Sequence, residues 1–346
     1  MARVAINGLG RIGRTFFKMA YDNPDFDIVA INDLGDIENL AYLLQYDTAY
    51  GRAGFEVATG DKKLIVNGNE ITVLSERDPA SLPWGKMDID IVVESTGFFA
   101  SYEKSKAHLD AGAKRVIISA PVKDDASAVG ITGATVLMGV NDDRLTACDI
   151  SSNASCTTNS VSPLIAILKS AIGIEKAVLN TVHAYTASQS VVDAPKTKDF
   201  RLGRTAAQNI IPTSTGAAIA TTLVHTDLVN KFDGIAMRVP VPVGSIVDVT
   251  FISSEPTTVE AVNKALTDAA ASNEWSNLFA VTNEPVVSSD IIGARFASIA
   301  DLSMTRVVDG NLVKVLAWYD NETSYTHTLV EQVTAMSRFF NQKTGH

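Results

Sequence analysis

The sequence predicts an α/β protein with a doubly wound parallel sheet in its N-terminal half and a second, α+β domain with a mostly antiparallel sheet in its C-terminal half. In the first half, short β-branched runs alternate with segments of helical apolar spacing. The second half instead carries longer alternating strands separated by few helices. A chain of 346 residues is long enough for about two domains, each with its own core.

The N-terminal domain is expected to alternate strands with helices. The expected strands are residues 4–7, 27–32, 89–95, 115–120 and 135–140. The expected helices are residues 11–21, 37–44 and 102–111. Residues 55–74 predict an inserted antiparallel meander, because Asn67 and Gly68 between two apolar runs favour a tight hairpin turn.

The C-terminal domain is expected to start near residue 153, where the pattern changes. The expected strands are residues 174–183, 234–240, 245–253 and 312–319, and the expected helices are residues 160–171, 257–272 and 326–340. Residues 184–208 lack sustained periodicity, and so long a loop in a compact domain is usually functional or part of an interface. We therefore expect domains at residues 1–152, completed by a C-terminal helix at 322–340, and at residues 153–321.

The composition argues against several classes of protein. The chain has 29 Lys and Arg against 39 Asp and Glu, a net charge of −10, which disfavours nucleic acid as a partner. It contains no run of 18 or more apolar residues, and its first residues lead straight into a strand. We therefore expect no membrane span, no signal peptide and a cytoplasmic location. With only Cys148 and Cys156, we expect reduced thiols and no metal site.

A glycine-rich turn directly follows the first expected strand and directly precedes a helix. Gly8, Gly10 and Gly13 allow a tight turn, close approach of a pyrophosphate and close packing of helix on strand. Asp33 lies 20 residues after Gly13, where a carboxylate accepts from a ribose diol and repels a 2′-phosphate. The alternative is a turn without a ligand. The strand, the spacing and the acid together favour a Rossmann-type site for NAD rather than NADP.

Cys156 lies in a small, hydroxyl-rich segment just before an expected helix. Backbone N–H groups and partial positive charge at a helix N-terminus stabilise a thiolate and can hold an oxyanion. We therefore expect Cys156 to be a nucleophile. Cys148 lacks this setting and is expected to be a small buried side chain.

His183 is the one histidine that ends a β-rich run and opens the long irregular segment. A base can be fixed at such a place, although a histidine there is also often structural, and the sequence leaves both roles open. A Cys–His pair alone fits a cysteine protease or another acyl hydrolase. Thiolate and nicotinamide together instead indicate aldehyde oxidation, through a thiohemiacetal and a thioester.

Longer motifs surround these residues. They are residues 7–14 (NGLGRIGR), 31–34 (INDL), 94–97 (ESTG), 155–159 (SCTTN), 183–186 (HAYT), 211–218 (IPTSTGAA), 238–240 (RVP) and 318–322 (WYDNE). In this order, and along nearly the full length of the chain, they resemble the phosphorylating glyceraldehyde-3-phosphate dehydrogenase family.

The resemblance implies a cytoplasmic homotetramer of glycolysis or gluconeogenesis. It would use NAD and inorganic phosphate to oxidise D-glyceraldehyde 3-phosphate to 1,3-bisphosphoglycerate. The resemblance makes Cys156 the nucleophile and His183 the base, and it implies no metal. It assigns phosphate binding to Ser155, Thr157, Thr186, Thr215, Gly216 and Arg238, with Thr186 and Arg238 at the C3 phosphate of the substrate. It assigns cofactor contacts to Gly8, Gly10, Arg11, Ile12, Gly13, Asp33, Arg77, Ser95, Thr96, Ser119 and Asn321.

Some positions depart from the family pattern. Leu202 stands where many members carry an arginine, which implies one cation fewer at the inorganic-phosphate site, although Arg201 and Arg204 flank it. Ile219 stands in place of a frequent lysine, and residues 323–324 replace an aromatic residue and a glycine. None of these changes touches the nucleophile or the base.

Two alternative functions remain open from the sequence. Erythrose-4-phosphate dehydrogenase resembles this family and keeps the Cys–His pair, but its relatives usually lack the run found at residues 214–218. A non-catalytic scaffold on the same fold would be indicated by loss of Cys156 or His183, and both are present.

Overall fold

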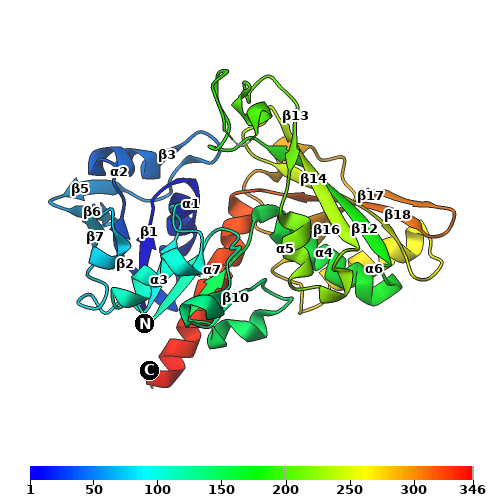
Figure 1. Ribbon diagram of the computed structural model, residues 1–346. Helices are drawn as coiled ribbons and strands as arrows, with labels where there is room; N and C mark the ends of the chain where they lie inside the picture. Colours follow the sequence, from blue (N-terminus) through cyan, green and yellow to red (C-terminus); the bar gives the residue numbers. More distant parts are fainter. Residues whose placement is uncertain (198, 345–346) are drawn as a thin grey trace. The chain divides into compact units, whose positions relative to one another are not determined.

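The computed structural model describes residues 1–197 and 199–344, which form two compact units (Figure 1). The first unit is Met1–Ala154 together with the C-terminal segment that starts at Thr326. The second unit is Ser155–Tyr325. These limits lie close to the expected ones at residues 152 and 322. Within the described ranges, no helix is both long and apolar enough to cross a membrane.

The first unit is built on one sheet with strand order β10-β11-β9-β8-β1-β2-β7-β6-β5. Its strands are β1 (Ala2–Asn7), β2 (Phe26–Asn32), β5 (Val57–Gly60), β6 (Lys63–Val66), β7 (Asn69–Leu74), β8 (Ile91–Glu94), β9 (Arg115–Ile118), β10 (Gly133–Thr135) and β11 (Ile150–Ser152). All pairs from β10 to β7 are parallel, and β5, β6 and β7 form the predicted antiparallel meander. A separate ribbon joins β3 (Tyr46–Asp47) and β4 (Gly51–Arg52). The predicted fold class of this unit is confirmed.

Two helices of the first unit begin where short polar side chains cap them. The helices of this unit are α1 (Arg11–Ala20), α2 (Ile37–Gln45), α3 (Tyr102–Asp110) and most of α7 (Thr323–Thr344), with 3₁₀ turns at Pro79–Ser81, Ala126–Val129 and Asp142–Ala147. Asp36 caps α2 and Ser101 caps α3, each accepting from N–H groups of the first turn. Phe16 of α1 and Leu329 of α7 enter one core, where a fully buried side chain of this kind stabilises by about 1.5–3 kcal/mol.

The second unit is built on a sheet with strand order β13-β14-β12-β15-β18-β17-β16. Its strands are β12 (Lys176–Ala184), β13 (Ile211–Ser214), β14 (Phe232–Val239), β15 (Ser245–Ile252), β16 (Phe279–Thr282), β17 (Ser298–Val308) and β18 (Leu312–Tyr319). Its helices are α4 (Cys156–Ile172), α5 (Ala217–Thr222) and α6 (Val259–Ala270), with 3₁₀ turns at Phe200–Gly203, Thr226–Leu228 and Ser288–Ile291. Only β12/β14 and β16/β17 pair in parallel among the pairs of this sheet. The predicted, mostly antiparallel sheet is confirmed.

Several predicted elements differ from the structure in their limits, and two of these differences have a clear local cause. The strand predicted at residues 135–140 ends at Thr135, because the side chain of Asn141 bonds both Leu137 N and Thr135 O and closes a turn. Helix α4 starts at Cys156 rather than at residue 160, because Ser155 Oγ accepts from Thr158 N and caps the helix earlier. Cys156 is therefore the first residue of the helix.

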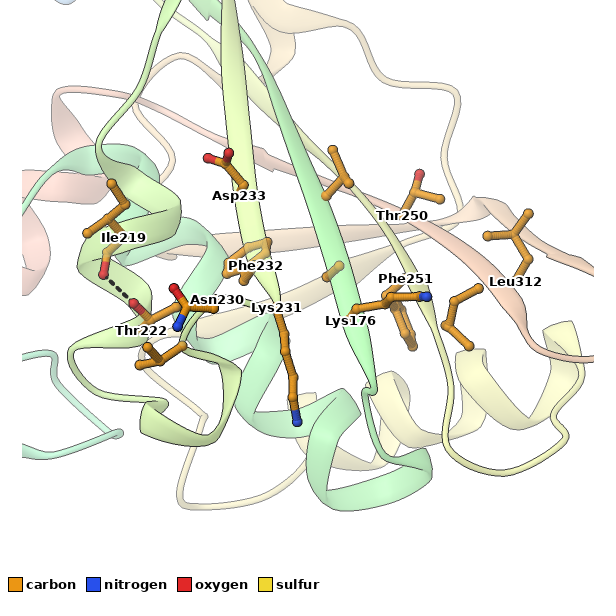
Figure 2. A pocket seen from close by; sticks show the side chains of 14 residues that line it. Lys176, Ile219, Thr222, Asn230, Lys231, Phe232, Asp233, Thr250, Phe251 and Leu312 are labelled. Carbon is orange, nitrogen blue, oxygen red and sulfur yellow. Dashed lines mark hydrogen bonds between the residues drawn. The ribbon is translucent and has the colours of Figure 1, made fainter.

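The sheet of the second unit also carries an exposed apolar region (Figure 2). A hollow of about 830 Å³ lies there, lined partly by Ile219, Phe232, Phe251 and Leu312. Lys176, Lys231 and Asp233 lie at the same hollow and carry its charge. Neither Cys156 nor His183 is among the lining residues, so this hollow is separate from the predicted catalytic pair.

Candidate functional site

A cavity of about 620 Å³ lies in the first unit, where β1, β2 and β8 end. Strand β1 lies between β2 and β8, so the chain leaves β1 in one direction and later returns on its other side. Ligands of open α/β sheets bind at such a switch point, beyond the carboxyl ends of the strands. The cavity is lined by six of the predicted cofactor residues: Gly8, Gly10, Asp33, Arg77, Ser95 and Thr96.

The glycines of the turn fit a bound pyrophosphate. Gly8 has φ +96°, and a Cβ there would lie 2.8 Å from Thr96 N. A Cβ on Gly13 would overlap the carbonyl oxygen of Gly8, so helix α1 packs closely only on a glycine. A Cβ on Gly10 would meet nothing within 4 Å, and Gly10 has no side chain to cap α1. The cavity therefore has room beside Gly10, and the N-terminus of α1 follows this residue directly. A pyrophosphate is favoured at such a helix N-terminus, so the residues fit NAD.

Asp33 is held at the edge of this cavity by backbone donors. Its Oδ2 accepts from Leu9 N at 2.7 Å, and its Oδ1 accepts from Gly35 N at 2.8 Å. A carboxylate has about four acceptor sites, so the side chain keeps capacity for ribose hydroxyls.

Three other predicted cofactor residues are not among the residues that line this cavity. The Arg11 side chain pairs with Asp47 at 2.6 Å, which leaves a phosphate contact to its backbone. Ile12 packs on the core. Ser119 donates its N–H to Glu94 O and does not line the cavity.

Asn321 belongs to the second unit and is buried. Its Oδ1 accepts from Gly244 N and from Ser245 Oγ, each at 3.1 Å. These bonds fix the amide group and leave its Nδ2 to donate.

In the second unit, the helix start and a strand end bring the predicted nucleophile and base together. Cys156 opens α4 and His183 precedes the last residue of β12. Cys156 Sγ lies 3.3 Å from His183 Nε2. This separation is short enough for a proton to pass between thiol and imidazole.

The other ring nitrogen of His183 has two neighbours. Nδ1 lies 2.6 Å from Ala184 O and 2.8 Å from Arg238 Nη1, and Arg238 Nη1 also donates to Ala184 O at 3.1 Å. Ala184 O only accepts and Arg238 Nη1 only donates, so the two contacts favour opposite tautomers. Because the Nδ1–Ala184 O contact is the shorter one and Arg238 Nη1 can donate to Ala184 O instead, we assign the ring proton to Nδ1, which leaves the Nε2 lone pair for the thiol. Burial, and then the Arg238 charge, lower the pKa of His183 to about 3, which keeps the ring neutral at neutral pH.

The thiol does not have the low pKa expected from its helix position. Burial raises the pKa of Cys156, although the Arg238 charge and hydrogen bonds from Thr157 act in the opposite direction. Loss of hydration outweighs the helix terminus here. The pair therefore rests as neutral thiol and neutral imidazole, and the expected thiolate requires proton transfer to His183.

Tyr319 is a site residue that the sequence did not single out, although it lies in one of the motifs. It is fully buried, and its OH bonds Thr157 Oγ1 at 2.9 Å and Thr181 Oγ1 at 2.8 Å. Its ring meets the His183 ring edge-on, with centroids 5.9 Å apart. Tyr319 thus links α4, β12 and the base; a lone tyrosine at a strand end gives no sequence signal for this role.

The predicted phosphate residues differ in what their side chains already contact. Ser155 caps α4, Thr157 bonds Tyr319, and Thr186 Oγ1 lies 2.9 Å from Ser188 Oγ. Thr215 Oγ1 accepts from Ala217 N at 3.2 Å, and the backbone of Gly216 is exposed just before α5. Arg238 Nε is buried and has no hydrogen-bond partner in the described part of the chain, so an anion beside it would satisfy it.

Comparisons with known proteins cover both units. A model described as the NAD binding domain of glyceraldehyde 3-phosphate dehydrogenase matches residues 2–102, and the model of its C-terminal domain matches residues 155–321. A glyceraldehyde-3-phosphate dehydrogenase of Geobacillus stearothermophilus is 48% identical over 331 residues, covering 95% of this chain and 96% of the relative. Glyceraldehyde-3-phosphate dehydrogenase 1 of Bacillus subtilis is 46% identical with the same coverage. The Clostridium acetobutylicum enzyme is 43% identical over 98% of this chain and 99% of its own.

Proposed function

Because this chain belongs to the glyceraldehyde-3-phosphate dehydrogenase family, we propose that it oxidises D-glyceraldehyde 3-phosphate with NAD and inorganic phosphate through a thioester on Cys156. It is an NAD-dependent oxidoreductase. The observation that carries the proposed mechanism is the 3.3 Å contact of Cys156 Sγ with His183 Nε2.

In the first step, Cys156 Sγ attacks the aldehyde carbon as its proton passes to His183 Nε2. The imidazolium then gives this proton to the aldehyde oxygen, which produces a thiohemiacetal. When bound, NAD supplies the acceptor for the hydride of the thiohemiacetal carbon. His183 takes the hydroxyl proton back as the carbonyl of the thioester forms.

In the second step, an oxygen of inorganic phosphate attacks the thioester carbon. The C–S bond breaks, the acyl phosphate leaves, and the proton on His183 returns to the sulfur of Cys156. With the acyl phosphate and NADH released, Cys156 and His183 are again a neutral thiol and a neutral imidazole.

Arg238 and Thr186 are proposed to hold the C3 phosphate of the substrate. The unpartnered Nε of Arg238 supports this role, because a phosphate oxygen there would complete a charge-assisted hydrogen bond. Ser155, Thr157, Thr215 and Gly216 are proposed to receive inorganic phosphate through hydroxyl and backbone donors.

A spectrophotometric assay tests the proposed function. NADH formation from glyceraldehyde 3-phosphate should depend on added inorganic phosphate. NADH formation that ignores phosphate, or none from this substrate, would refute the proposal.

Replacing Leu202 by arginine is expected to strengthen phosphate use. The flanking cations have partners, since Arg201 pairs with Asp199 at 3.0 Å and Arg204 with Asp193 at 2.9 Å. Because both side chains are already paired, we expect them to replace the missing arginine only in part. A new charge-assisted contact is worth about 1.5–3 kcal/mol, so the apparent KM for phosphate should fall roughly ten- to a hundredfold in Leu202→Arg.

Phosphate titrations of both proteins measure this effect, and the KM for NAD serves as the internal control that should not change. Identical phosphate saturation curves for two folded proteins would mean that residue 202 has no part in this site.

Asp33 is expected to make the enzyme prefer NAD to NADP by about tenfold or more in kcat/KM, because a 2′-phosphate would face its carboxylate. Asp33→Asn keeps the shape of the side chain and removes its charge, so it should narrow this preference. Asp36→Asn removes a nearby charge that does not line the cavity and should leave the preference unchanged. Equal kcat/KM values for the two cofactors in the wild type would contradict the role of Asp33.

We also propose that the protein is a cytoplasmic homotetramer, as its family resemblance implies. Large exposed apolar side chains on the second unit support association, among them Phe200 at 80%, Val191 at 78% and Val178 at 60% exposure. Sedimentation velocity tests the oligomeric state. We expect a species of four 36.9 kDa chains, and a monomer would contradict the proposal.

A further inference from the structure

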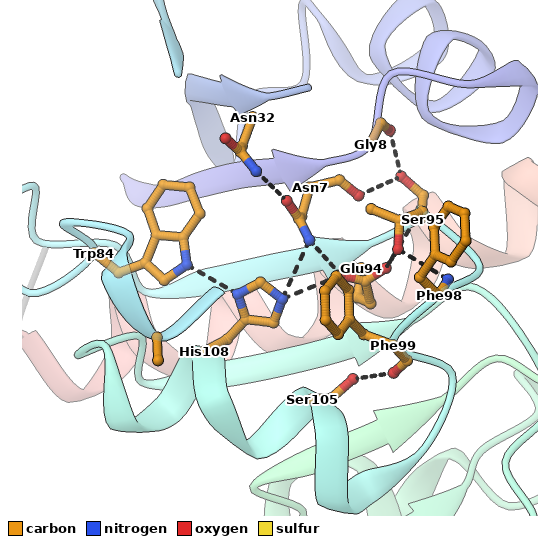
Figure 3. A network of polar contacts seen from close by, with 12 residues as sticks. Asn7, Gly8, Asn32, Trp84, Glu94, Ser95, Phe98, Phe99, Ser105 and His108 are labelled. Carbon is orange, nitrogen blue, oxygen red and sulfur yellow. Dashed lines mark hydrogen bonds and ion pairs between the residues drawn. The ribbon is translucent and has the colours of Figure 1, made fainter. Parts of the chain in front are cut away.

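Three parallel strands of the first unit end in one row of polar side chains (Figure 3). Asn32 of β2, Asn7 of β1 and Glu94 of β8 are register partners at the carboxyl ends of these strands. Asn32 Nδ2 donates to Asn7 Oδ1 at 2.7 Å, and Asn7 Nδ2 donates to Glu94 Oε2 at 2.5 Å. All three side chains are buried.

His108 approaches the same carboxylate from helix α3 and has a defined tautomer. Trp84 Nε1 lies 3.0 Å from His108 Nδ1. An indole N–H only donates, so Nδ1 accepts and the proton of the neutral ring lies on Nε2. His108 Nε2 then donates to Glu94 Oε2 at 3.1 Å. His108 and Trp84 are both fully buried.

The second oxygen of Glu94 binds the segment that follows it. Thr96 N donates to Glu94 Oε1 at 2.8 Å, and Thr96 Oγ1 donates to the same oxygen at 2.5 Å. Together with Asn7 and His108, this makes four donors around one carboxylate that is 2% exposed. A deprotonated carboxylate offers about four acceptor sites, so all are used.

This carboxylate shapes the wall of the cofactor cavity without lining it. Ser95, Thr96 and Phe98 line the cavity, whereas Glu94 and His108 do not. Thr96 Oγ1, which is fixed by Glu94, accepts in turn from Phe98 N at 3.1 Å. The same segment is tied to the glycine-rich turn, because Ser95 Oγ donates to Gly8 O at 2.7 Å.

We propose that Glu94 is a positioning residue for NAD, which holds residues 95–98 in the conformation that binds the cofactor, and that His108 and Trp84 hold Glu94 in turn. This inference rests on the proposed use of the cavity by NAD. If the network had a purely structural role, a substitution in it would lower the stability of the fold and leave the affinity for NAD unchanged. The two roles therefore differ in what a substitution does to NAD binding.

Glu94→Gln is the most direct test, because it replaces one acceptor oxygen by an amide that faces donors. We expect the dissociation constant for NAD, measured by isothermal titration calorimetry, to rise by about tenfold or more. The KM for NAD should rise with it, while kcat at saturating NAD stays within about twofold of the wild-type value.

Asp90→Asn is the matched control, because Asp90 directly precedes the first residue of β8 and Glu94 is its last. Asp90 is also a buried carboxylate, and it accepts from Arg3 N at 2.8 Å and from Lys114 Nζ at 2.5 Å, away from the cavity. We expect this variant to melt at a lower temperature and to bind NAD with an unchanged dissociation constant.

Two substitutions of His108 test the network without touching the cavity, and they decide the question if Glu94→Gln does not fold. In His108→Gln, the amide donates to Glu94 and accepts from Trp84, so NAD affinity should stay near the wild-type value. In His108→Leu, both bonds are lost, and affinity should fall severalfold.

The wild-type titration separates failure of this inference from failure of the proposed function. Wild-type protein that does not bind NAD would refute both. Wild-type protein that binds NAD, together with unchanged affinity in Glu94→Gln or His108→Leu, would overturn the positioning role alone. The positioning role would also be overturned if Asp90→Asn lost as much affinity for NAD as Glu94→Gln.

Discussion

Replacing Cys156 by serine is expected to abolish NADH formation while leaving NAD binding intact. An alcohol has a far higher pKa than a thiol, so His183 cannot activate it by taking its proton. Among the described residues, those that line the cofactor cavity all belong to the first unit, whereas Cys156 belongs to the second. The dissociation constant for NAD, measured by calorimetry, should therefore match that of the wild type.

Cys148→Ser is the matched control for this experiment. Cys148 is the other free cysteine, it is buried, and its Sγ lies 3.4 Å from Arg144 O. Its replacement should leave turnover close to the wild-type rate. Turnover retained in Cys156→Ser, or lost equally in Cys148→Ser, would show that Cys156 is not the nucleophile.

Replacing His183 by asparagine is expected to slow the chemical step by about a hundredfold or more, which is the usual contribution of a general base. The resting thiol keeps its proton because burial raises the pKa of Cys156, so attack requires an acceptor. The asparagine amide is not basic enough to take the proton of the thiol. Single-turnover rates of NADH formation measure this step directly.

His225→Asn provides the control, because His225 is another buried histidine of the second unit, with Nε2 3.3 Å from Ser162 O. Its replacement is expected to affect stability more than the rate of the chemical step. If His183→Asn gave the wild-type single-turnover rate, another group would have to act as the base.

The sequence predicted the parts of the structure that depend on local spacing. Gly8, Gly10 and Gly13 stand between a strand and a helix, and that spacing was sufficient to predict the Rossmann-type unit and its use of NAD, both of which are confirmed. The position of Asp33 at the edge of the cavity followed from its place after the second strand.

The contacts that depend on long-range pairing were not predictable. Glu94 and His108 stand 14 residues apart, and nothing in their spacing shows that a strand end and a helix meet. Tyr319 reaches Thr157 across 162 residues of sequence. The raised pKa of the Cys156 thiol was also missed, because burial depends on the surrounding fold rather than on the helix start.

Mass spectrometry, first of the intact protein and then of its peptides, tests the central claim most directly. The protein is mixed with glyceraldehyde 3-phosphate and NAD without phosphate, quenched in acid, and digested to locate any adduct. The proposed mechanism predicts a phosphoglyceroyl thioester on Cys156, which disappears when inorganic phosphate is added before the quench. The absence of an acyl adduct, or an adduct on any other residue, would contradict it.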